Sequence, residues 1–146
     1  MLPSHIFRAY DIRGLVDPDL SDEGVRRIAK AFGLEVRAAG GGPVVLGRDC
    51  RPSSERFGAI FARALTESGI DVVDVGQVPT PLVYYAAHVI EGVGGMAMIT
   101  GSHNPPEYNG FKLGVGKDAL YGEKIRGLYA LAMAGDFPSG EGRLVR

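Results

Sequence analysis

Residues 96–106 read MAMITGSHNPP, and this stretch decides the fold class that the sequence predicts. Its first four residues are apolar, which is typical of a short buried strand. From Thr100 to Pro106 the residues are small, polar or ring-locked, which is typical of a loop. A loop that follows a strand presents the hydroxyl of Ser102 at the edge of a sheet. The stretch therefore predicts a nucleophile or a phosphate carrier at this edge.

Apolar strands and amphipathic helices alternate along the chain around this stretch. Helices are predicted where apolar residues recur at intervals of three and four after a capping residue or a proline. These helices begin at Ser21, Pro52, Thr80 and Tyr121. The apolar face of the first consists of Val25, Ile28, Ala29, Phe32 and Val36, and that of the third consists of Leu82, Tyr85, Ala86 and Val89. Strands are predicted over residues 6–12, 44–46, 70–75, 95–99 and 110–115.

Strands that alternate with helices predict a three-layer α/β/α domain whose mixed sheet is mostly parallel. This domain is expected to span residues 1–134. Residues 135–146 contain Gly, Pro and Ser with little periodicity, so they are predicted to be an interdomain linker. Ligands of such sheets bind outside the carboxyl ends of the strands. We therefore expect four polar residues to share one rim, namely Arg13, Arg48, Gln77 and Ser102.

The composition is that of one globular domain of 146 residues, 45% of them hydrophobic and 23% charged. The formal net charge of -1 argues against nucleic acid as a partner, because proteins that bind it usually carry a basic stripe. No apolar run approaches the roughly 20 residues of a membrane span, so no membrane partner is expected. The single cysteine, Cys50, cannot form an internal disulfide, which favours a cytoplasmic location.

Chemistry alone leaves two interpretations of Ser102 open. A serine hydroxyl is a weak nucleophile that needs a base, and His103 is not expected to serve because neighbours on an extended loop point in opposite directions. One interpretation is a turn serine that bonds to the local backbone. The other is a phosphate carrier, which adds about -1.5 to -2 charges and needs cations nearby. Lys112 can supply one if the chain returns through a turn at Asn109-Gly110.

Two further segments place charged side chains near predicted strand ends. Arg13 can hold phosphate oxygens with its planar guanidinium, or it can form a surface ion pair with an acid such as Asp11. Asp49 is expected to pair with Arg48 or Arg51 and so to organise the end of its strand.

Four motifs together resemble the first domain of the α-D-phosphohexomutase family, in its phosphomannomutase/phosphoglucomutase branch. They occur in the order of the family and extend over nearly the entire chain. The last motif is the longest and the most specific. The motifs are FRAYDIRG at residues 7–14, GRDCR at 47–51, VPTP at 78–81 and TGSHNPPEYNGFK at 100–112.

The resemblance implies that Ser102 is a phosphoserine. It would donate phosphate to a hexose monophosphate and take one back, with a sugar 1,6-bisphosphate between the two transfers. Glucose 1,6-bisphosphate or an equivalent would be the activator. A Mg²⁺ would be a cofactor, bound partly through a phosphate oxygen on Ser102.

The resemblance also implies roles for residues around this serine. Lys112 would act as an acid or base, and His103 would belong to the same catalytic loop. Tyr10, Arg13 and Asn104 would contact the substrate or the phosphoryl group. These residue types suit phosphoryl transfer, which needs positioning and charge neutralisation more than covalent chemistry.

Members of this family have four domains, and this chain matches the first. The aspartate cluster of the metal site and the loops that recognise the sugar would belong to domains 2–4, which are therefore expected partners. We expect the chain alone to be inactive and its uncovered surface to favour self-association. The alternative is a non-catalytic module that binds phosphate or a partner, with a serine that is never phosphorylated.

Overall fold

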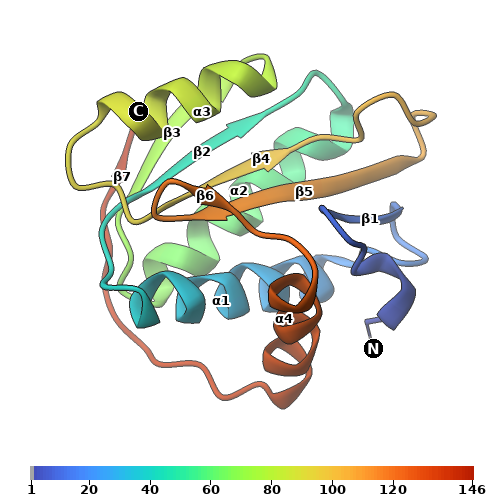
Figure 1. Ribbon diagram of the computed structural model, residues 1–146. Helices are drawn as coiled ribbons and strands as arrows, with labels where there is room; N and C mark the ends of the chain where they lie inside the picture. Colours follow the sequence, from blue (N-terminus) through green and yellow to red (C-terminus); the bar gives the residue numbers. More distant parts are fainter. Residues whose placement is uncertain (1) are drawn as a thin grey trace.

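The computed structural model describes residues 2–146, which form a seven-stranded sheet between two layers of helices (Figure 1). The strands are β1 (Ile12–Leu15), β2 (Val44–Arg48), β3 (Val72–Gln77), β4 (Gly95–Ile99), β5 (Tyr108–Val115), β6 (Asp118–Ala119) and β7 (Leu144–Val145). The helices are α1 (Asp22–Ala38), α2 (Pro52–Glu67), α3 (Thr80–Val89) and α4 (Glu123–Ala134), after a 3-10 turn, η1 (Ser4–Ile6). The predicted α/β/α class is confirmed.

The sheet is mixed, with the strand order β1-β5-β4-β2-β3-β7 and with β6 paired to β5. Strands β2, β3, β4 and β7 run parallel, whereas β5 is antiparallel to both β4 and β1. The register sets Arg48 of β2 opposite Gln77 of β3 and Ile99 of β4. Three parallel strands therefore end at one level, and the loops that follow them share one edge of the sheet.

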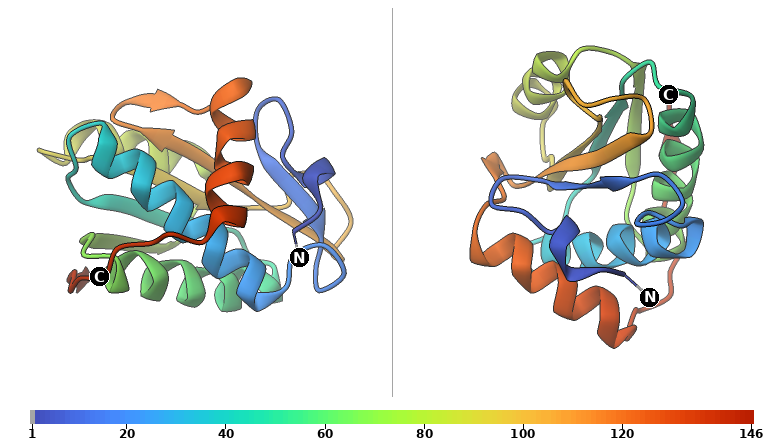
Figure 2. Two further views of the ribbon diagram at one scale, coloured as in Figure 1. Left: turned by 90° about the horizontal axis from the view of Figure 1, so that it is seen from below. Right: turned by 90° about the vertical axis from the view of Figure 1, so that its right-hand side faces the viewer.

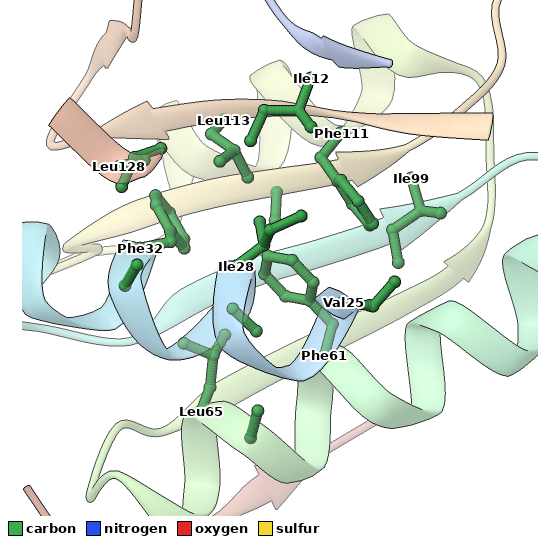
Figure 3. Packing of buried hydrophobic residues seen from close by; sticks show 14 of the residues in the cluster. Ile12, Val25, Ile28, Phe32, Phe61, Leu65, Ile99, Phe111, Leu113 and Leu128 are labelled. Carbon is green, nitrogen blue, oxygen red and sulfur yellow. The ribbon is translucent and has the colours of Figure 1, made fainter. Parts of the chain in front are cut away.

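Helices α1 and α2 cover one face of the sheet, α3 covers the other, and α4 packs against α1 (Figure 2). The larger core lies between the sheet and α1 and α2 (Figure 3). Four phenylalanines stack within it, and the rings of Phe61 and Phe111 lie 5.4 Å apart between centroids. The smaller core, beneath α3, is built around Val45, Val83 and Met98.

The starts of the first two helices follow from their capping residues. Ser21 accepts a hydrogen bond from the backbone N–H of Gly24 at 3.0 Å, and Pro52 is the first residue of α2. The predicted apolar face of α1 is confirmed, because all five of its residues are fully buried. Within the described part of the chain, none of the helices combines the length and apolar character that a membrane crossing requires.

The predicted face of α3 is wrong for three of its four residues. Leu82, Tyr85 and Val89 are exposed to 44%, 64% and 57%, whereas Ala86 packs against the smaller core around the buried Val83 and Ala87. Seven of the ten residues in this helix are apolar or aromatic, and they lie on all sides of it. The spacing of apolar residues therefore does not single out one face. Contact with β2 and β4 decides the face instead.

The predicted strand over residues 6–12 is also wrong. Phe7 pairs with Ile12 in an isolated bridge, and the backbone N–H of Arg8 donates to Asp11 O at 2.9 Å, so the chain turns back between them. Regular pairing begins at Ile12. The turn leaves Arg8 and Tyr10 in solvent, where Tyr10 is 79% exposed.

The segment 135–146 runs along the domain as a bound strap. Gly140 N–H donates to Glu67 O at 2.9 Å and Gly142 N–H donates to Thr66 O at 2.8 Å. The segment ends in β7, which extends the sheet beyond β3. Its role as an interdomain linker stays a prediction, but its backbone is hydrogen-bonded to this domain.

Phe61 offers a test of the larger core. We expect Phe61→Ala to lower the free energy of unfolding by about 3–5 kcal/mol, because it leaves a cavity among stacked rings. Tyr85→Ala, on the exposed face of α3, is the matched control and should change it by less than about 0.5 kcal/mol. Urea unfolding followed by circular dichroism measures both. Equal losses in the two variants would contradict this packing.

Candidate functional site

The candidate site is the loop over residues 100–107, which joins β4 to β5. The turn predicted at Asn109-Gly110 is wrong, because both residues lie within β5. Gly110 is opposite Arg13, and a side chain there would collide with the backbone of Ile12. This glycine therefore permits the close approach of β1, and the chain reverses earlier, at the loop.

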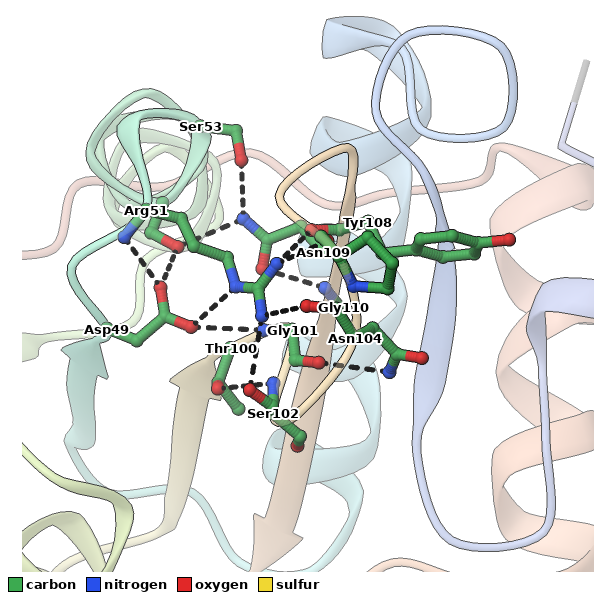
Figure 4. Close-up of polar contacts among 12 residues, drawn as sticks. Asp49, Arg51, Ser53, Thr100, Gly101, Ser102, Asn104, Tyr108, Asn109 and Gly110 are labelled. Carbon is green, nitrogen blue, oxygen red and sulfur yellow. Dashed lines mark hydrogen bonds and ion pairs between the residues drawn. The ribbon is translucent and has the colours of Figure 1, made fainter.

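Arg51, at the start of α2, is the centre of this loop (Figure 4). A guanidinium has five N–H donors, and all five are used here. The Nε–H donates to Asp49 at 3.2 Å, and the four remaining donors reach backbone carbonyls of three loop residues and of the first residue of β5. These carbonyls belong to Ser102 (3.1 Å), Asn104 (2.7 Å), Pro105 (2.6 Å) and Tyr108 (3.1 Å).

Asp49 connects the end of β2 to the same loop. It pairs with Arg51, as predicted, and it accepts hydrogen bonds from the hydroxyl of Ser54 and, at 3.1 Å, from the backbone N–H of Gly101. Burial acts to raise the pKa of its carboxyl, but the hydrogen bonds from Ser54, Arg51, Thr100 and Gly101 outweigh it and lower that pKa below 3.8. The carboxylate is therefore charged when it holds the arginine.

The backbone of Ser102 is bound on both sides in a left-handed conformation. Its φ is 54°, a region that a residue with a Cβ adopts at a cost of about 1–2 kcal/mol. Its N–H donates to the Thr100 hydroxyl at 2.9 Å, and its carbonyl accepts from Arg51. The preceding residue is Gly101, where a Cβ would collide with the Arg51 guanidinium. The loop thus requires glycine beside the serine.

The two residues after the serine have different environments. His103 is exposed, and Ser102 is half-buried in a turn. Asn104 donates to Gly101 O from both its backbone N–H and its side-chain amide, each at 3.0 Å. Asn104 therefore has a structural part in the loop, and its predicted contact with substrate stays a prediction, as does the catalytic role of His103.

The structure brings three predicted residues together in one place. Tyr10, Arg13 and Lys112 line an open pocket of about 510 Å³. Arg8 adds a third basic side chain, against one acid, Asp11, which pairs with Arg13 at 2.5 Å. Such a lining favours an anionic ligand. A larger hollow of about 870 Å³ near β6 has two acids and one base in its lining and contains none of the predicted residues.

The predicted residues share one edge of the sheet by their backbone positions, but their side chains do not all point to the same face. Arg48 and Gln77 lie level in the register. However, the Arg48 side chain passes close to Gly58 of α2, whereas Lys112 shares its pocket with Tyr84 of α3. Because α2 and α3 cover opposite faces of the sheet, Arg48 is separated from the pocket that contains Arg13 and Lys112.

Several residues of the site were not predicted from the sequence. Asn109 is fully buried and donates from its side chain to the hydroxyls of Ser53 at 2.8 Å and Ser54 at 3.0 Å, which fastens β5 to α2. Tyr84 lines the pocket from α3. The sequence signal for Arg51 was its place in the motif GRDCR. No sequence pattern predicts that it binds backbone carbonyls about fifty positions later in the chain.

The predicted metal ligand is Ser102, which offers a single oxygen. Mg²⁺ prefers about six oxygen ligands and usually keeps several waters. Within residues 2–146 no group of three or more His, Cys, Asp or Glu side chains is placed to hold a metal ion. Ser102 alone could therefore supply one of the ligands of such an ion.

Comparison with known proteins gives one consistent family. Residues 4–137 match the model of "Phosphoglucomutase/phosphomannomutase, alpha/beta/alpha domain I". The chain is 47% identical over 141 residues to the phosphomannomutase/phosphoglucomutase of Pseudomonas aeruginosa, which covers 97% of this chain and 30% of that protein. It is 48% identical over 126 residues to the phosphoglucomutase of Neisseria gonorrhoeae, covering 86% of this chain and 27% of that protein.

A solved structure of a phosphoglucomutase/phosphomannomutase family protein from Burkholderia thailandensis superposes with a TM-score of 0.93 at 45% identity. The match covers 99% of this chain and 33% of that one. The chain thus spans about 30% of the length of the relatives that it matches.

The lowered pKa of Asp49 predicts how stability depends on pH. Its carboxylate stabilises the folded chain fully above the ordinary pKa of 3.8, and this contribution is lost as the pH falls below 3.8 toward the folded value. The difference in unfolding free energy between wild type and Asp49→Asn should therefore shrink between about pH 6 and about pH 3. Urea titrations at each pH measure it.

Asp136→Asn, at an exposed position, is the control for this experiment. Its difference from wild type should stay small throughout the range. A constant difference for Asp49→Asn across the range would show that the charge of the carboxylate does not stabilise the loop.

Proposed function

The chain belongs to the phosphoglucomutase/phosphomannomutase family as its α/β/α domain I, and we propose that it is the phosphoserine-bearing part of a hexose-phosphate mutase. The observation that carries the proposal is Ser102, held at both its backbone N–H and its carbonyl in a loop at the carboxyl edge of the sheet. The mutase would interconvert the 1-phosphate and the 6-phosphate of glucose or mannose, the sugars in the names of the relatives.

The reaction is two phosphoryl transfers of opposite direction. In the first, the bond between phosphorus and the Ser102 oxygen breaks, and that phosphorus bonds to the free hydroxyl of the sugar monophosphate. The hydroxyl gives up its proton to a base, and the serine oxygen takes one up. In the second, the bond between the other phosphorus of the sugar 1,6-bisphosphate and its sugar oxygen breaks, and that phosphorus bonds to the Ser102 oxygen. The serine hydroxyl gives up its proton, and the sugar oxygen takes one up to leave the isomeric monophosphate. Phosphate is conserved over the cycle.

The pocket lined by Tyr10, Arg13 and Lys112 contains groups of the kind that such transfers need. We assign to Lys112 the exchange of protons with the reacting oxygens, and to Tyr10 and Arg13 contact with the sugar phosphate. The excess of basic side chains in this pocket supports the assignment, because charge spreads over the phosphoryl oxygens in the transition state. His103 and Asn104 belong to the same loop and are assigned to positions near the phosphate.

A magnesium ion and further domains belong to the proposal. Mg²⁺, bound partly through a phosphate oxygen on Ser102, would neutralise charge on the transferred group. Its other ligands, and the residues that distinguish glucose from mannose, would come from domains 2–4, which the longer relatives provide room for. A sugar 1,6-bisphosphate would be the activator, and a cytoplasmic location agrees with the exposed free Cys50.

Phosphate on Ser102 is the direct test. We expect intact-mass spectrometry of the full-length protein that carries this domain to find one phosphate, which glucose 1,6-bisphosphate restores after removal and which Ser102→Ala abolishes. The chain of 146 residues alone should not turn over glucose 1-phosphate or mannose 1-phosphate, because the proposal assigns the remaining metal ligands and the sugar-recognition residues to domains 2–4. An unmodified serine after incubation with the bisphosphate would favour a non-catalytic binding module.

Lys112 can be tested in the same protein. Lys112→Met should lower kcat by about 10²–10⁴-fold, the usual contribution of a general acid or base. Lys117→Met, at an exposed position on the turn after β5, is the matched control and should keep the wild-type kcat. Wild-type kcat in Lys112→Met would remove the lysine from the mechanism while leaving the phosphoserine in place.

A further inference from the structure

We propose that Arg51 is a positioning residue for phosphoryl transfer, which holds the Ser102 loop in its reactive shape without touching substrate. This inference rests on the proposed function. Its evidence is the guanidinium at the centre of the loop and the complete use of its donors.

The hydrogen bonds of Arg51 exclude a direct role in binding phosphate. Each of the five N–H donors already has a protein acceptor: one on Asp49, three on loop carbonyls and one on the carbonyl of Tyr108 in β5. The side chain is only 13% exposed, and its charge is balanced by the adjacent carboxylate. A phosphate could reach this guanidinium only if the loop came apart. Arg51 therefore acts on the reaction through the backbone of the loop.

The same bonds determine where the serine points. The carbonyls of Ser102 and Asn104, on the two sides of His103, are both drawn to one nitrogen, Nη2. That arrangement orients the peptide planes around Ser102, whose positive φ is unfavourable for an isolated serine. Without the guanidinium, the half-buried carbonyls of Ser102, Asn104 and Tyr108 would lose this donor, and the serine would be free to leave this conformation.

Arginine is required by geometry, because lysine cannot reproduce the arrangement. An ammonium has three donors around one point, whereas the guanidinium spreads five in a plane. Gly101 is the complement of that plane, since a Cβ there would collide with the guanidinium. Gly101 and Arg51 thus form one matched pair, one from each of the two loops that meet at the site.

The test measures steady-state kinetics of the full-length protein with Arg51→Lys and Arg51→Ala. We expect kcat to fall about 10²-fold in both variants, the effect of misplacing a reacting group by about 1 Å. KM for the sugar phosphate should stay near the wild-type value, because its contacts lie elsewhere. Millimolar guanidinium, far below denaturing concentrations, should restore part of kcat to Arg51→Ala and none to Arg51→Lys.

Arg63→Ala is the control, because Arg63 is an exposed arginine on the same helix, α2, away from the loop. It should keep the wild-type kcat with and without guanidinium. Amide hydrogen exchange over residues 100–108 should become faster in both Arg51 variants and stay unchanged in Arg63→Ala. If Arg51→Ala does not fold, Arg51→Lys carries the test.

The outcomes separate this inference from the proposed function. A wild-type protein without transfer to or from Ser102 overturns the proposed function, and the inference with it. An active wild type with undiminished kcat in Arg51→Lys overturns the inference alone. A raised KM with unchanged kcat also overturns it, because that result assigns Arg51 to substrate binding.

Discussion

The ion pair between Asp49 and Arg51 is the interaction on which the site depends. It lies between the end of β2 and the start of α2, and it reaches across to the loop between β4 and β5. A buried arginine is stable only when its donors are satisfied, and here backbone carbonyls satisfy most of them. Three of these carbonyls belong to loop residues outside the strands and helices. The arginine therefore supplies the donors that these backbone carbonyls lack, and the carbonyls supply the acceptors that the arginine needs.

This mutual dependence explains the surrounding residues. Ser54 and Gly101 donate to the carboxylate that orients the arginine, and Asn109 connects the serines at the start of α2 to β5. Aromatic packing joins the same two elements, because the ring centroids of Phe57 in α2 and Phe111 in β5 lie 6.1 Å apart. Packing thus sets the distance between α2 and β5, and at that distance the hydrogen bonds between them can form and determine the conformation of the loop.

Much of this architecture could be predicted from the sequence, because helix caps and apolar spacing are local signals. The face of α1 and the buried strand before Ser102 followed from them. The face of α3 did not, since a helix with apolar residues on all sides is oriented by its neighbours. The strand β7 did not either, because two exposed residues at a sheet edge carry no pattern.

The candidate site likewise contains residues that the sequence predicted and others that it did not. Motifs pointed to Ser102, Lys112, Tyr10 and Arg13, and the structure places the last three around one pocket. They could not show that Arg51 serves the loop, because its partners are carbonyls that every residue possesses. A sequence shows the role of a residue when its side chain acts by its own chemistry. It does not show that role when the side chain binds backbone carbonyls, because only the fold shows which carbonyls lie within reach.

The charges near the loop also bear on how a phosphate on Ser102 would be neutralised. A phosphate on Ser102 would carry about -1.5 to -2 charges. The guanidinium behind the loop cannot offset them, because Asp49 already balances it and its donors are all engaged. Arg13 is paired with Asp11, so even the pocket gives less positive charge than its arginines suggest. Under the proposed function, Arg8 and Lys112 of the pocket and a cation from beyond the loop, such as the proposed magnesium ion, would share the neutralisation of this phosphate.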